Sequence, residues 1–188
     1  MMRRLFGRTR ARAETATTLY GAIVAQARAP ALYASLGVPD AVGGRFEMVV
    51  LHTVLVLRRL QEGGAAEAAV GQAVFDLFCR DMDRSLRELG VGDLGVPKRM
   101  RQVGEAFYGR AQVYGDCLAR ADEAALAEAL RRNALKEAAT DRGAVGLARY
   151  ALATAAAVAA VAPGDLLTGS VPFRDPAEFA VSGVGAAA

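Results

Sequence analysis

Histidine, cysteine and tryptophan are scarce or absent in this sequence, which limits the chemistry it can support. Hydrolytic triads, His-based metal sites and most general-base schemes need histidine, and the chain holds one, His52. The only cysteines, Cys79 and Cys117, lack a CxxC spacing, so we expect reduced, apolar side chains in a cytosolic compartment. Neither a GxGxxG segment nor a Walker-type phosphate loop occurs, so nucleotide binding has no support.

The acidic residues do not supply the missing chemistry. Asp76, Asp81 and Asp83 resemble the aspartate clusters of all-helical magnesium enzymes, but their i,i+5 and i,i+2 spacings scatter them around a helix. No second aspartate pair follows at helical spacing. We therefore expect no catalytic residue, metal site or cofactor, and we interpret His52 as a neutral, hydrogen-bonded core residue.

The net charge of +3 is unevenly distributed. Residues 1–12 carry no acid, and without their arginines the chain has 18 basic against 20 acidic side chains. A cationic segment can bind anionic lipid headgroups or RNA phosphates, although a solvated tail has the same composition. We predict contact with an anionic membrane surface or a ribosome through these five arginines: Arg3, Arg4, Arg8, Arg10 and Arg12. The other arginines alternate with acids, so no sequence-specific nucleic-acid binding is expected.

The longest apolar stretch, Phe46–Leu60, predicts a central helix of about 20 residues buried on all sides. Asp40 is its expected N-cap, and Gly63 lies just beyond its end. The sequence predicts no transmembrane span. The central segment is short and flanked by charge, and an arginine such as Arg149 at the centre of the last helix costs about 2.5–3.5 kcal/mol on insertion.

Periodic apolar residues predict further helices on both sides, and only six prolines interrupt the chain. The sequence thus predicts an all-α fold: a single compact bundle of six to seven helices. We expect a basic tail over residues 1–14, a helical domain over 15–162 and an irregular tail over 163–188, with disorder over 181–188. The expected outer helices are Thr15–Arg28, Ala65–Leu89 (inner face Phe75, Phe78, Met82, Leu86 and Leu89), Pro97–Leu118, Asp122–Ala138 and Thr140–Val161.

The helix predicted from Pro97 carries small residues, Gly104, Ala111 and Gly115, on one face. Each glycine costs about 0.5–1 kcal/mol relative to alanine in a helix, so the strip indicates close approach of another element. A second helix of the same protein is the favoured partner, and a protein client is the alternative. We assign client binding to this region, with the residues Arg99, Gly104, Tyr108, Arg110, Ala111 and Gly115.

Three segments resemble one known family. Leu51–Leu60 reads LHTVLVLRRL, Arg80–Asp93 reads RDMDRSLRELGVGD, and Phe107–Arg110 reads FYGR with Tyr114 following. These segments are similar, in order and spacing, to motifs of the ubiquinol–cytochrome c chaperone family. The resemblance covers roughly residues 20–135.

The resemblance implies an assembly chaperone for the cytochrome bc1 complex that binds newly made cytochrome b and has no enzymatic activity. Mitochondrial relatives act with a small helper protein and associate with the ribosome. This chain lacks their long targeting extension, so we expect a bacterial form that is cytoplasmic or peripheral at the inner membrane. Two alternatives remain open: a carrier of isoprenoid or other lipid with an enclosed apolar pocket, and a structural scaffold subunit.

Overall fold

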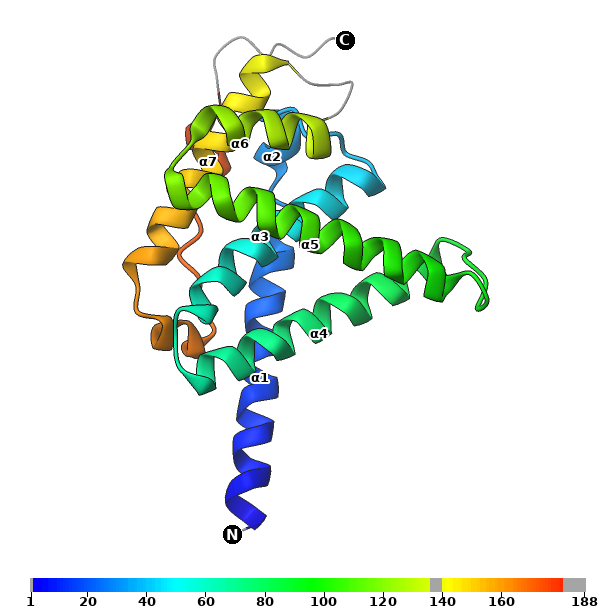
Figure 1. Ribbon diagram of the computed structural model, residues 1–188, viewed down its shortest axis with the longest axis vertical. Helices are drawn as coiled ribbons and strands as arrows, with labels where there is room; N and C mark the ends of the chain where they lie inside the picture. Colours follow the sequence, from blue (N-terminus) through cyan, green and yellow to red (C-terminus); the bar gives the residue numbers. More distant parts are fainter. Residues whose placement is uncertain (1, 136–139, 181–188) are drawn as a thin grey trace.

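The computed structural model describes residues 2–135 and 140–180, with side chains from residue 9 onward. Over these ranges it contains helices and no strand, so the predicted all-α bundle is confirmed (Figure 1). Seven α-helices lie in the described ranges: α1 (Met2–Ala27), α2 (Pro30–Ala34), α3 (Val42–Gln61), α4 (Ala65–Glu88), α5 (Val96–Arg120), α6 (Glu123–Leu130) and α7 (Asp141–Ala160).

Helix α3 is the predicted central helix. Every residue from Glu47 to Val56 is buried, which confirms that the helix is covered on all sides. Helices α1, α4, α5 and α7 all contact it. Packing against this one helix therefore removes the apolar faces of four outer helices from water. Each Å² of apolar surface buried in this way stabilises the fold by about 25 cal/mol.

The start of α3 differs from the prediction. Its N-cap is Ala41, which makes no side-chain hydrogen bond, whereas the Asp40 carboxylate accepts a hydrogen bond from Arg45 Nε at 2.6 Å. The chain turns tightly here, because a Cβ on Gly44 would lie 2.1 Å from the carbonyl oxygen of Pro39. Only glycine permits this approach.

The helix expected over Thr15–Arg28 begins much earlier. Helix α1 starts at Met2, so the basic segment expected to be a tail is helical. From residue 9 onward, where side chains are described, its buried residues, including Ala16, Leu19 and Ile23, all lie in the second half. In Figure 1 the first half projects away from the bundle.

Helices α4 and α5 form a hairpin that also projects from the body (Figure 1). The chain turns after α4 through Gly90, whose φ of +84° suits the predicted glycine at this position. The predicted inner face of α4 is partly wrong, because Leu89 is 59% exposed whereas Val70 and Val74 are buried. Leu94, at the tip of the hairpin, is fully exposed.

The second half of the chain follows the prediction closely. Asp122 caps α6 by accepting a hydrogen bond from Ala125 N at 3.0 Å, and Thr140 caps α7 through Gly143 N at 3.1 Å. The α-helical part of the expected 122–138 helix ends at Leu130 and continues as a π-helical turn, Arg131–Leu135. Its last predicted residues lie outside the described ranges.

After α7 the chain folds back over the body in two 3-10 helices, Pro163–Thr168 and Pro176–Phe179. Leu166 is fully buried, and the ring of Phe173 packs edge-on against His52 at 5.4 Å between centroids. The expectation of disorder over 181–188 concerns residues outside the described ranges.

Helix α7 is long and apolar enough to cross a membrane by length and composition, and no other described helix is. Half of its most apolar window is buried inside the bundle, including Tyr150 and Thr154. The core helix of a water-exposed bundle meets the same criterion, so composition alone does not assign α7 to a membrane.

Candidate functional site

The residues predicted to bind a client lie on two different sides of α5. A helix turns by about 100° per residue. Gly104, Tyr108, Ala111 and Gly115 therefore form one line along the helix, which we call the α5 stripe. Arg99 and Arg110, which are eleven residues apart and so within about 20° of each other, lie on the opposite side: Arg110 pairs with Glu47, and Arg99 lines a groove.

The α5 stripe is open at both of its glycines, whereas Ala111 is partly buried against the core. A Cβ built on Gly104 or Gly115 would meet no atom within 4 Å outside the local helix. The favoured explanation for these glycines, close packing against another helix of the same protein, is therefore wrong within the described residues. Among the side chains that the structure describes, none outside the local helix fills the space beside these two glycines.

Tyr108 gives the stripe its one large side chain. It is 64% exposed, and its ring lies 5.8 Å from the ring centroids of both Phe75 and Phe107. The two phenylalanine rings contact the Tyr108 ring, and most of the side chain remains exposed. Aromatic side chains held in this way are typical anchors of protein interfaces.

A cavity of about 410 Å³ lies at the Gly115 end of the stripe. It lies where α3, α5 and α7 meet, and Arg58, Leu118 and Leu152 are among its lining residues. Arg58 donates a hydrogen bond to the Gly115 carbonyl at 2.7 Å, which ties α5 to the end of α3.

Arg110 forms an internal ion pair with Glu47. Its Nε lies 2.7 Å and a terminal nitrogen 2.6 Å from the two carboxylate oxygens of Glu47, and the second terminal nitrogen donates to the Ala106 carbonyl at 3.2 Å. The Glu47 side chain is 5% exposed and that of Arg110 22%. Hydrogen bonding to Glu47 raises the pKa of Arg110 above its ordinary value. The structure thus gives Arg110 a role in holding α5 on α3.

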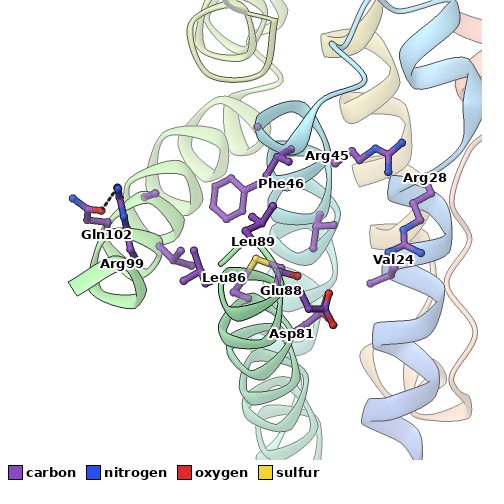
Figure 2. Close-up of a pocket in the computed structure, with 17 residues that line it drawn as sticks. Val24, Arg28, Arg45, Phe46, Asp81, Leu86, Glu88, Leu89, Arg99 and Gln102 are labelled. Atoms are coloured by element: carbon purple, nitrogen blue, oxygen red, sulfur yellow. Dashed lines mark hydrogen bonds between the residues drawn. The ribbon is translucent and has the colours of Figure 1, made fainter. Parts of the chain in front are cut away.

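Arg99 lines a groove of about 640 Å³ bounded by α1, the start of α3, the end of α4 and the start of α5 (Figure 2). We call it the α1–α5 groove. Its apolar lining includes Val42, Phe46, Leu86 and Leu89. Sequence reasoning missed this groove, although the predicted apolar face of α4 ran to Leu89, which lines it.

His52 lies in the core, as the sequence indicated. Its Nδ1–H donates to the Met48 carbonyl at 2.7 Å, because a carbonyl only accepts, so Nε2 accepts from the Tyr150 hydroxyl at 2.6 Å. Gln26 in turn donates to the Tyr150 oxygen at 2.9 Å. Complete burial lowers the pKa of His52 to about 4, so the ring is neutral at physiological pH.

The three aspartates considered for metal binding each interact with a neighbouring side chain. Asp81 accepts a hydrogen bond from the Tyr20 hydroxyl at 2.7 Å, Asp83 pairs with Arg87 at 2.7 Å, and Asp76 accepts from Gln72 at 2.8 Å. Among the residues with described side chains, no group of three potential metal ligands comes together.

The predicted basic contact residues occupy the projecting half of α1. Arg10 pairs with Glu14 at 2.8 Å on an exposed surface, and Arg12 is exposed. The backbone of α1 carries Arg3, Arg4 and Arg8, whose side chains lie outside the described part.

Comparisons with known proteins agree with the sequence motifs. A family model described as ubiquinol-cytochrome C chaperone matches residues 34–173. The crystal structure of the Cbp3 homolog from Brucella abortus superimposes with a TM-score of 0.85 and 38% sequence identity, over 94% of this chain and 98% of that one. A search of curated proteins found no match.

Proposed function

Because the chain belongs to the ubiquinol–cytochrome c chaperone family, we propose that it assists assembly of the cytochrome bc1 complex by binding cytochrome b. The observation that supports this most strongly is the agreement of two independent comparisons. The family match covers residues 34–173, which include α3, α4, α5 and α7, and the similarity to the Cbp3 homolog extends over nearly the whole of both chains.

The physical properties of the fold suit this activity. A multi-span membrane protein exposes apolar helices before insertion, and such surfaces aggregate in water. A protein that covers them reversibly needs exposed apolar contacts and no reactive group. The hairpin of α4 and α5 presents Leu89, Leu94 and Tyr108 to solvent, each at least 59% exposed.

Deletion of the gene tests the proposal. We expect membranes of the deletion strain to lose the b-type and c1-type heme absorbance of the bc1 complex, while the heme signals of other respiratory complexes remain. A plasmid copy of the gene should restore the spectrum. Normal bc1 absorbance in the deletion strain would disprove the function.

We place the client contact on the α5 stripe. Because a Cβ at Gly104 or Gly115 meets no neighbour, a leucine there projects into the space that a client would occupy. We expect Gly104→Leu and Gly115→Leu to fold normally and to reduce the recovery of cytochrome b with the chaperone. Gly109→Leu is the matched control, since Gly109 is equally open but lies on another face of α5. Equal recovery with all three folded variants would remove the stripe from the client surface.

We further propose that the basic half of α1 binds an anionic surface, either the inner membrane or the ribosome, from the cytoplasmic side. Arg10 and Arg12 are exposed on a helix that extends beyond the bundle. Screening weakens such contacts as salt rises. Deletion of residues 2–12 should therefore reduce cofractionation with membranes or ribosomes most strongly at low salt. An unchanged distribution at every salt concentration would contradict this.

The cavities bear on the lipid-carrier alternative. A carrier is expected to enclose its ligand, whereas the rim of the α1–α5 groove includes Val42 at 61% and Leu89 at 59% exposure. An open groove with an apolar rim favours a macromolecular partner. A scaffold subunit would instead remain in the purified bc1 complex in fixed stoichiometry, which distinguishes it from a transient chaperone.

A further inference from the structure

The α1–α5 groove has apolar walls made by helices and an apolar rim that faces water. Phe46 and Val103 are half-buried in its walls, and Val42 and Leu89 are mostly exposed at its edge. Contiguous exposed apolar surface of this kind marks interaction sites in folded proteins. A groove between helices is a usual receptor for one further helix, whose apolar face replaces water in it.

Basic and acidic side chains both line the groove. Figure 2 shows Arg28 and Arg45 next to one another, Arg99 on the other side, and Asp81 and Glu88 below on α4. Asp81 is engaged by the Tyr20 hydroxyl. Arg45 is partly neutralised by Asp40, but Arg28 forms no ion pair among the residues described.

The first turn of α3 adds to the positive end of the groove. Val42 and Gly43 line the groove there, and the N-cap Ala41 supplies no side-chain acceptor for the first amides of the helix. The unpaired N–H groups carry a partial positive charge, equivalent to about half an elementary charge at a helix N-terminus. Together with Arg28 and Arg45, this end of the groove complements a negative group.

We propose that the α1–α5 groove binds one apolar helix of the protein client, oriented so that its carboxylate-bearing C-terminal end meets Arg28 and Arg45. The inference rests on the proposed chaperone function. The C-terminal end is specified because the dipole of the bound helix places its negative pole there, beside any Asp or Glu side chains. The apolar walls bind the helix, and the charges set its direction.

Model peptides test the orientation directly. The probes are three fluorescein-labelled, amidated 18-residue peptides with Leu at i,i+3,i+4 positions and Gln elsewhere. One ends in Asp-Glu, one begins with Asp-Glu, and one ends in Lys-Lys. Titration of the full chain, followed by fluorescence anisotropy at low salt, should show the first peptide binding at least about tenfold tighter than the third. Binding of the second should be intermediate or weak.

Variants of the chain locate the binding site. Leu89→Glu should weaken all three peptides about tenfold, as expected for the loss of one buried apolar contact. Leu94→Glu is the matched control, because Leu94 is fully exposed on the same hairpin but does not line the groove. Arg28→Glu should abolish the preference for the acidic C-terminus while the affinity for the Lys-Lys peptide is retained or increased.

The outcomes separate this inference from the proposed function. Equal affinity for all three peptides, or binding that Leu89→Glu leaves unchanged, would overturn the inference. Displacement of the peptides by oleate, together with equal affinity for the three peptides, would also overturn it, because the groove would then bind a lipid and not an oriented helix. In cells, normal bc1 assembly with Leu89→Glu, in a strain background where gene deletion abolishes assembly, would refute the groove alone. Normal assembly in the deletion strain would refute the chaperone function itself.

Discussion

Replacing Arg110 by methionine should destabilise the fold strongly, because it leaves the Glu47 carboxylate buried without its cation. The two side chains share three short nitrogen–oxygen contacts of 2.6–2.9 Å, and Glu47 is 4% exposed. Removing one member of a buried ion pair costs about 3–5 kcal/mol. Water can reach this site through the 22% of Arg110 that is exposed, so we expect about 3 kcal/mol for Arg110→Met.

Matched changes at Glu47 determine how much of this cost is the interaction energy between the Arg110 and Glu47 side chains. Glu47→Leu removes the carboxylate but leaves the Arg110 cation partly hydrated, because that side chain is 22% exposed, so about 1–2 kcal/mol is expected. In the double variant Glu47→Leu/Arg110→Met, apolar side chains fill the site, and such replacements are often nearly neutral. The coupling energy across the cycle should exceed about 1.5 kcal/mol in magnitude.

Urea unfolding at pH 7, monitored by circular dichroism, measures these free energies. A loss below about 0.5 kcal/mol for Arg110→Met, or additive single variants, would show that the ion pair does not hold α5 on α3. The double variant also tests the earlier assignment of Arg110 to client binding. If the double variant folds but does not recover cytochrome b, Arg110 contacts the client as well as pairing with Glu47.

Two further predictions concern the core and the glycines. The folded-state pKa of His52 is about 4 against an ordinary 6.5, so the unfolded chain binds more protons between these values and stability falls as pH decreases through this window. Between pH 7 and pH 5 the loss should be about 2 kcal/mol, and His52→Phe, compared by urea unfolding, should lack it; an equal pH dependence in the variant would contradict the assignment. Gly104→Ala and Gly109→Ala should each raise the unfolding free energy by about 0.5–1 kcal/mol, because the added Cβ meets no neighbour and a helical glycine is replaced; destabilisation of either would show that the space is not open.

The sequence predicted those parts of the fold in which one local pattern determines the outcome. A run such as Met48–Val56, in which only His52 and Thr53 are polar, cannot remain exposed at any face, so its central position followed directly. Asp122 and Thr140 were recognisable as caps because each precedes a helical run and its side chain reaches the amide three residues on. These signals require no knowledge of distant residues.

Predictions failed where the outcome depended on a partner from elsewhere in the chain. Asp40 is as good a capping residue as Asp122, but its carboxylate accepts a hydrogen bond from Arg45, five residues later, and does not cap the helix. Leu89 continues the apolar face of α4, yet it stays 59% exposed at the rim of the α1–α5 groove. For Gly104 the sequence indicated that something approaches closely but could not indicate whether it belonged to this chain.

The position of Arg110 explains how α5 can offer two surfaces at once. Phe107, Arg110 and Tyr114 follow one another at i,i+3 and i,i+7, so the apolar contacts and the ion pair to Glu47 lie along one line that faces the core. The stripe and the groove lie on the two flanks of that line. Because the ion pair fixes the rotation of α5 about its own axis, a change that allowed α5 to turn would widen one surface and narrow the other. If either flank binds the proposed client, its shape depends on the Arg110–Glu47 ion pair, which lies between the two surfaces.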